Sequence, residues 1–181
     1  MSIIETKLER RRIRLISALG DFQLASSASA FLAEVDVAER YSTKQLRRFR
    51  CYETSLIIAY TRPFTQTKGT VPRLSIKMTN AKLTQEQSSL HGRVMELRNK
   101  ITAHTDEEMM RFATTTFPLD QDNGTDFHFL QMEFDEGLTF IGNELWEFDT
   151  LLRTVSAATY RTLLEQVQAN PAAFRIRKNA D

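Results

Sequence analysis

The spacing of apolar residues predicts helices over the first third of the chain. Gly20-Asp21 can end a first helix, or Gly20 can lie inside one long helix at a cost of about 1 kcal/mol. The small residues of 25–30 would allow close packing against another helix. The apolar positions expected to face the core are Leu8, Ile13, Leu15, Ile16 and Leu19, followed by Phe22, Leu24, Phe31, Leu32 and Val35.

A second helix is predicted from about Ser42 to Tyr60. Ser42 with Gln45 three residues later is the pattern of a capping box, in which two side chains satisfy the first backbone N–H groups. The helix should end near Thr61, because Arg62 precedes a proline and that position disfavours helical geometry. Its buried stripe, at steps of three or four residues, consists of Phe49, Tyr52, Leu56 and Tyr60.

A third helix is predicted to begin near Thr84, with Gln87 completing another capping pattern. Residues 62–83 before it carry prolines and a glycine and are expected to be irregular. The core face of this helix has the 4-3-4 spacing of a buried stripe, formed by Leu90, Val94, Leu97 and Ile101.

The pattern then changes to alternation and β-branched residues, which predicts a hairpin. Its strands are expected near 111–117 and 126–134, with the turn signal Asp120-Gln121-Asp122-Asn123-Gly124 between them. Because an isolated hairpin is only marginally stable in water, we expect it to lie on the helices.

A last long helix is predicted from about 139 to 170, ended by Asn170-Pro171, with the tail 171–181 expected to fray. Its seam is Ile141, Leu145, Phe148, Leu152 and Val155, extended by Leu163 and Val167. Trp146 and Phe148 are both expected in the core. The fold class is therefore mainly α: one domain over 1–181, a bundle of four to five helices with a hairpin inserted at 111–134.

Composition narrows the classes of function. The chain has 181 residues and a single cysteine, Cys51, which excludes an intramolecular disulfide and a Cys-based zinc site. We expect a cytoplasmic location, no membrane span and no cofactor. No metal is expected either, since the three histidines stand at no standard ligand spacing. The alternative is a metal-dependent hydrolase with a site assembled in three dimensions from His104, Asp106 and His128. No phosphate-binding loop, dinucleotide fingerprint or DNA sequence-reading motif is present.

Charge is strongly segregated, although the net charge is only +1. Residues 40–104 carry 13 basic and 3 acidic side chains, a net of +10, and residues 105–150 carry 1 basic and 12 acidic, a net of −11. The basic block indicates a surface for a polyanion such as RNA. Alternatively, the two blocks neutralise each other within one chain or across a homodimer.

One motif carries recognisable chemistry. Arg98-Asn99 and His104, at the end of the third predicted helix, resemble the signature of the HEPN superfamily (higher eukaryotes and prokaryotes nucleotide-binding domain). In that family an arginine followed by a polar residue is separated from a histidine by four to six intervening residues, and five residues lie between Arg98 and His104. The segment from Leu97 to Asp106 is also similar to helical proteins of the abortive-infection branch of that superfamily.

The resemblance implies a metal-independent endoribonuclease or an RNA-binding protein, in bacterial defence or toxin–antitoxin function, with two motifs meeting in a dimer cleft. His104 would be the general base, since histidine titrates near neutrality, and Arg98 would stabilise the phosphate. Asn99 would orient one of them. The expected products end in a 2′,3′-cyclic phosphate and a 5′-hydroxyl. The alternative is a non-catalytic helical module that binds a protein regulator.

Three further residues are possible supports for this site. Glu53 shares a helix face with apolar residues, so its carboxylate needs a partner. That partner is Arg98 or His104 in a functional interpretation, and Arg62 or another basic residue in a structural one. Arg62 could line a phosphate path or fix a loop. Asp106 would favour the cationic form of His104.

Overall fold

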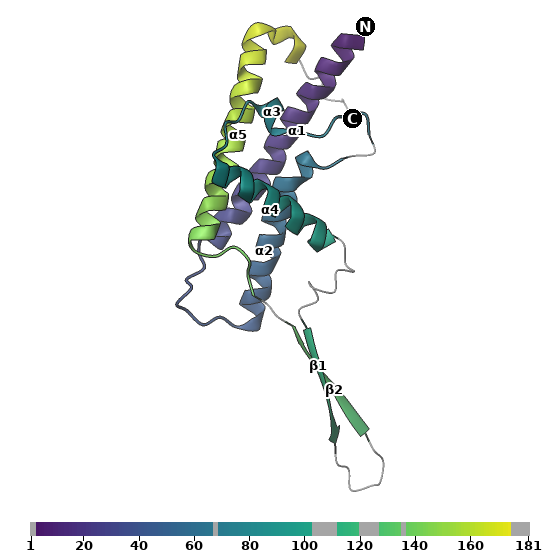
Figure 1. The fold of residues 1–181 in the computed structure, drawn as a ribbon, viewed down its shortest axis with the longest axis vertical. Helices are drawn as coiled ribbons and strands as arrows, with labels where there is room; N and C mark the ends of the chain where they lie inside the picture. Colours follow the sequence, from purple (N-terminus) through teal and green to yellow (C-terminus); the bar gives the residue numbers. More distant parts are fainter. Residues whose placement is uncertain (1–2, 67–68, 103–111, 120–126, 135–136, 175–181) are drawn as a thin grey trace, which may run out of the picture.

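The computed structural model describes residues 3–66, 69–102, 112–119, 127–134 and 137–174 and confirms the mainly α class (Figure 1). A two-stranded hairpin precedes the last long helix, as predicted. In chain order the elements are α1 (Ile3–Leu32), α2 (Thr43–Thr61), the 3-10 helix η1 (Arg62–Phe64), α3 (Ile76–Thr79), α4 (Gln85–Thr102), β1 (Phe112–Leu119), β2 (Phe127–Phe134), α5 (Asn143–Ala169) and the 3-10 helix η3 (Pro171–Phe174).

Helix α1 is continuous through Gly20, so the long-helix alternative holds. Its buried face is built from alternating large and small residues, among them Leu15, Ala18 and Phe22, which are inaccessible to solvent. Part of the predicted core set is wrong. The side chains that instead project into solvent are Leu8, Ile13, Ile16, Leu24 and Phe31. Four of them, Ile13, Ile16, Leu24 and Phe31, point away from the buried face, since each residue turns the helix by 100°. Leu8 lies only about 20° around the helix from the buried Leu15, so its exposure is not explained by its position around the helix.

Helix α2 begins with the predicted capping box: Ser42 Oγ accepts from the Gln45 N–H, and Gln45 Oε1 accepts from the Ser42 N–H at 2.9 Å. It ends at Thr61 as expected, but for a different reason. Arg62 keeps helical dihedrals (φ −51°, ψ −45°), and the chain tightens into η1 instead of leaving helical geometry. Pro63 is tolerated there because the first turn of a helix needs no N–H donor.

The core lies where α1, α2 and α5 pack together, and α4 crosses in front of them in Figure 1. Tyr60 of α2 is fully buried at its centre and contacts the rings of Phe22, Phe64 and Phe148. The predicted α2 stripe is confirmed, with Phe49 and Leu56 buried as well. Aromatic side chains from three helices therefore fix the position of α2.

Helix α4 has the predicted cap, in which Thr84 and Gln87 exchange two hydrogen bonds of 3.2 Å. Val94 is fully buried, and Leu90 and Leu97 pack against the core, as the 4-3-4 spacing predicts. The side chain of Ile101 lies outside the described residues.

Helix α5 begins four residues later than predicted. Ile141 therefore precedes the helix and is 45% exposed, which corrects its assignment to the seam. The tail is corrected too, since residues 171–174 form η3, where Phe174 lies under the Arg12 guanidinium. Residues 175–181 lie outside the described part of the chain.

The hairpin pairs its strands antiparallel, from Phe112 opposite Phe134 to Leu119 opposite Phe127. It projects away from the helices (Figure 1), so the expectation that it lies on them is wrong. Leu130 and Met132 on β2 are more than half exposed.

Over Lys7–Leu32, α1 is long and apolar enough to cross a membrane by length and composition alone. Within the protein, 39% of that window is buried. The core helix of a soluble protein and a signal sequence meet the same criterion, so this finding alone assigns α1 to neither.

Candidate functional site

The described part of the HEPN-like motif lies at the end of α4. Arg98 is half-buried, and its Nη1 donates to Oδ1 of the exposed Asn99 at 3.2 Å. The bond joins the guanidinium, which lies beside the buried stripe about 40° around the helix from Val94, to its neighbour in sequence. The two side chains are thus adjacent at the protein surface, where a planar donor fork could meet a phosphate.

His104 and Asp106 lie outside the described residues, so the motif's histidine has no described position. Its distance from Arg98 therefore stays a matter of prediction. On an ideal helix, residues six positions apart point about 120° away from each other. The assignment of Arg98, Asn99 and His104 to one site remains the hypothesis drawn from sequence.

Glu53 has a structural role that spacing could not identify. Its carboxylate is 6% exposed, and Oε1 accepts from the backbone N–H groups of Thr139 at 2.6 Å and Phe140 at 2.7 Å. These bonds satisfy two buried donors just before α5 and place the Phe140 ring against Phe148.

Arg62 pairs with Asp21 of α1 at 2.8 Å, so it is not the ionic partner of Glu53. Arg62 and Glu53 are nine positions apart, about 13 Å along a helix, which explains why they do not meet. Arg62 therefore ties the end of α2 to the middle of α1, a loop-fixing role. The pair is exposed on the arginine side and contributes little to stability.

The surface of α2 carries a group of four cations. Lys44, Arg47 and Arg48 are exposed and Arg50 is half-buried, whereas the only acidic residue of α2, Glu53, is buried. A shallow groove of about 570 Å³ lies on this face and is lined by Arg47, Arg50, Cys51, Thr54 and Ser55. Hydroxyl groups and cations together can bind the oxygens of a phosphate chain. We call this surface the α2 basic face.

By contrast, Arg12 and Arg14 of α1 make hydrogen bonds inside the fold. Arg14 is 6% exposed and its Nε donates to the Pro72 carbonyl at 2.7 Å. Arg12 donates to the Ala173 carbonyl at 3.1 Å. These side chains hold the connection before α3 and the C-terminal turn, so they add little to a polyanion surface.

A buried polar pair was not identified from sequence. The hydroxyl of Tyr60 and Nδ1 of His91 are 2.8 Å apart, between α2 and α4. Burial raises the pKa of Tyr60 well above its ordinary value and lowers the pKa of His91. A neutral imidazole can thus accept from the phenol. His91 packs edge-on against Phe64, so its role is to join helices.

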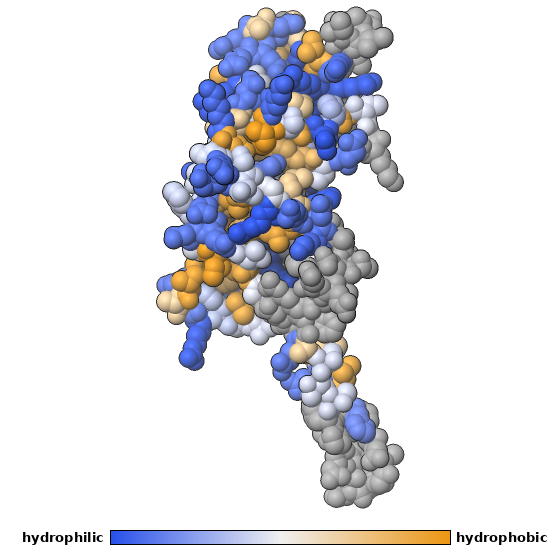
Figure 2. Space-filling view, in the orientation of Figure 1, coloured by the Kyte–Doolittle hydropathy of each residue, from blue (hydrophilic) through white to orange (hydrophobic). Residues whose placement is uncertain are grey.

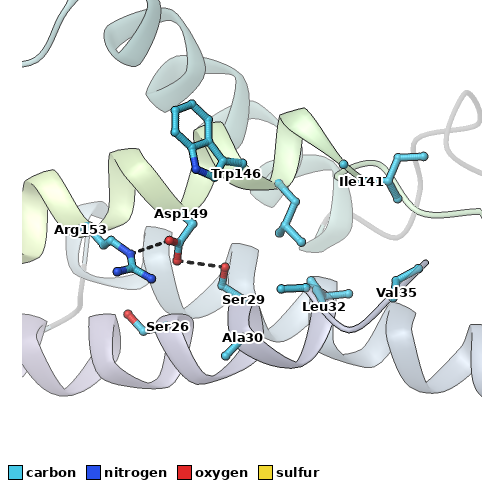
Figure 3. Close-up of a pocket in the computed structure, with 12 residues that line it drawn as sticks. Ser26, Ser29, Ala30, Leu32, Val35, Ile141, Trp146, Asp149 and Arg153 are labelled. Atoms are coloured by element: carbon cyan, nitrogen blue, oxygen red, sulfur yellow. Dashed lines mark hydrogen bonds and ion pairs between the residues drawn. The ribbon is translucent and has the colours of Figure 1, made fainter. Parts of the chain in front are cut away.

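A groove between the C-terminal part of α1 and the start of α5 was also missed (Figure 3). Its volume is about 520 Å³, and Trp146 stands over it with 69% of its surface exposed. The expectation that Trp146 lies in the core is wrong: it is two residues from the buried Phe148, hence about 200° around the helix. Apolar lining comes from Leu32, Val35, Ile141 and Leu145.

One wall of this groove is polar. Asp149 accepts from the Ser29 hydroxyl at 3.2 Å and pairs with Arg153 at 2.5 Å, as Figure 3 shows. Figure 2 shows apolar surface gathered over the end of the molecule where α5 begins. We call this feature the Trp146 groove. No family model, curated protein or solved structure matches this chain.

Proposed function

We propose that the chain is a HEPN-like RNA-binding protein, acting as a metal-independent endoribonuclease where its motif is complete. The observation that carries the proposal is the α2 basic face, whose exposed charges are all positive and which has a shallow groove lined by Arg47 and Arg50. Such a surface binds the phosphate backbone without reading base sequence. Single-stranded or structured RNA is the polyanion that the motif resemblance favours.

In the proposed chemistry, Arg98 would bind the phosphate at the cleavage site, with Asn99 holding its guanidinium as in the 3.2 Å contact. His104 would remove the proton from the ribose 2′-hydroxyl. The 2′-oxygen would then attack the adjacent phosphorus and expel the 5′-oxygen, which takes up a proton. The bond formed and the bond broken leave a 2′,3′-cyclic phosphate and a 5′-hydroxyl.

Binding is tested by fluorescence anisotropy with a labelled RNA over a series of salt concentrations. The double variant Lys44→Gln/Arg47→Gln should bind RNA more weakly and reduce the salt slope by about 0.7 for each phosphate that it no longer neutralises. Arg161→Gln removes an exposed cation from α5 and is the matched control. Equal affinity in both variants, or no binding of the wild type at low salt, would refute the proposal.

The alternative is a protein-interaction module, and the Trp146 groove favours it. Exposed tryptophan over a concave apolar surface with a polar edge is typical of interface hot spots. The occupant would be a partner-protein segment that inserts an apolar side chain between Leu145 and Val35. Because Trp146 is the only tryptophan, binding there should shift its emission to the blue. Trp146→Ala should then abolish partner binding and leave RNA affinity unchanged.

A further inference from the structure

The outer face of α1 is apolar over five turns and is partly exposed to solvent, with Phe31 at its C-terminal end also packing against the ring of Tyr52 at 5.0 Å. Ile13, Ile16, Leu24 and Phe31 are exposed by 47%, 36%, 49% and 46%. At 100° per residue these four side chains, with Gly20 and Ser27 between them, fall within an arc of about 80°. We call these six residues the α1 stripe. A helix of a globular protein ordinarily presents charged or polar side chains on its outer face.

The stripe has two properties of a surface that can be desolvated when a partner binds. Within about 60° of Ile13 on either side, residues 13–31 include no charged side chain. The exposed serines there bond to their own helix: Ser17 donates to the Arg14 carbonyl at 3.2 Å and Ser27 to the Gln23 carbonyl at 3.1 Å. Both hydroxyl donors would therefore keep their acceptors when water is removed from this surface.

Gly20 adds an independent observation. It lies in the middle of α1, where glycine costs about 1 kcal/mol relative to alanine. A Cβ built on Gly20 meets nothing within 4 Å, so no contact inside this chain requires the glycine. A missing side chain at the centre of an apolar stripe leaves the backbone open to close approach by another helix.

We propose that the α1 stripe binds a second copy of this chain, with the two α1 helices antiparallel about a two-fold axis between residues 20 and 24. Four of the six stripe residues, Ile13, Gly20, Leu24 and Phe31, meet stripe residues of the partner in this arrangement, whereas Ile16 and Ser27 meet positions 28 and 17. Each position i meets the position 44 − i of the partner helix. Leu24 then meets the open backbone at Gly20, and Ile13 meets Phe31. A two-fold dimer requires such matching of one surface with itself.

The stripe runs from residue 13 to 31, so it is about 27 Å long, and a helix presents a strip about 10 Å wide. The two strips together would bury roughly 540 Å², less than the ~1,200 Å² of a standard specific interface, which predicts a weak dimer that dissociates on dilution. The mass should therefore be measured by sedimentation or light scattering over a wide range of protein concentration.

Leu24→Lys places a charge in the centre of the interface and should weaken the dimer about tenfold or more. Because Leu24 is exposed, the variant should keep the thermal stability of the monomer. Leu164→Lys is the matched control: this leucine of α5 is 42% exposed and off the stripe, and the change should leave dimerisation unaltered. A wild type that is monomeric at every concentration, or a dimer that survives Leu24→Lys, would overturn the proposal.

Disulfide trapping tests the register in a Cys51→Ser background. A mixture of Ile13→Cys and Phe31→Cys proteins should form a mixed disulfide. Neither variant alone should cross-link, since each new cysteine lies about 27 Å from its own copy along the paired helices. Cross-linking of each variant with itself would indicate parallel helices and refute the antiparallel dimer. Flotation of monomeric wild type with anionic vesicles, abolished in Leu24→Lys, would assign the stripe to a membrane surface instead.

Discussion

At the scale of single residues, the Tyr60–His91 pair is a part-buried contact that should depend on pH. Its atoms are 2.8 Å apart, and desolvation of His91 lowers the pKa of the imidazole. The raised pKa of Tyr60 keeps the phenol neutral, so it can donate to an unprotonated Nδ1. Protonation of that nitrogen would reverse the direction of the bond and would place a positive charge on an imidazole that is shielded from water.

We therefore expect the free energy of unfolding to fall as the pH drops below about 6.5, the ordinary pKa of histidine. His91 has a lower pKa in the folded state than in the unfolded state, so the unfolded state takes up the proton at a higher pH. The contribution of His91 to stability is therefore full above the unfolded-state pKa and is lost as the pH falls below it. Urea denaturation between pH 5 and 8 measures this. His91→Gln should flatten the slope, and His128→Gln, on the exposed hairpin, should keep it. A wild-type slope in His91→Gln would contradict the assignment.

A second residue-scale prediction concerns His104. If the protein cleaves RNA, His104→Ala should reduce the rate by about 10²–10⁴, the usual contribution of a general base. Arg98→Lys should also lose activity, because an ammonium lacks the planar donor fork. Both are assayed on a structured RNA pool with chelator present, beside thermal melting. Cleavage by His104→Ala at the wild-type rate would show that the base is another residue.

At the scale of elements, Glu53 fixes the entry to α5. Glu53→Ala would leave the buried N–H groups of Thr139 and Phe140 without this acceptor, so we expect a loss of about 2–4 kcal/mol in unfolding free energy. Glu53→Gln keeps an amide oxygen at the same place and should cost less. Urea unfolding compares the two. Equal losses would show that the negative charge, rather than an acceptor, is what the site needs.

The elements themselves are largely predictable from sequence, because caps and apolar spacing are local signals. The capping boxes at Ser42 and Thr84 and the Val94 stripe are where the pattern placed them. Local sequence signals do not show which apolar face of a helix is covered by the rest of the protein. Leu24 and Trp146 are exposed, although leucine and tryptophan are common in protein cores. Whether such a side chain is buried depends on how helices that are distant in sequence pack together.

The candidate site is less predictable than the fold for the same reason. The pattern indicates that Glu53 is a buried carboxylate in need of partners, but those partners are backbone groups 86 and 87 residues away. The hairpin strands follow from alternation, whereas their projection from the bundle does not. Arg98 and Asn99 are in contact because they are neighbours in sequence. The spacing of residues alone could not show which other side chains lie beside them.

At the scale of the whole molecule, two different surfaces could join copies of the chain. The +10 block of residues 40–104 and the −11 block of 105–150 would attract each other across a dimer by charge. The α1 stripe would join copies by apolar contact, and residues 13–31 put no charge in it. Salt acts oppositely on the two mechanisms, because mobile ions screen exposed charges but do not weaken the burial of apolar surface.

Dimerisation through the α1 stripe should therefore persist, or strengthen, when the salt concentration rises from about 0.05 to 1 M, over which the screening length falls from roughly 14 to 3 Å. Sulfate should favour the dimer more than chloride, since it is excluded from apolar surface. Sedimentation equilibrium at each salt measures the dissociation constant. RNA binding by the α2 basic face should weaken over the same range. If the dimer dissociates in step with the RNA complex, charge rather than the α1 stripe holds the copies together.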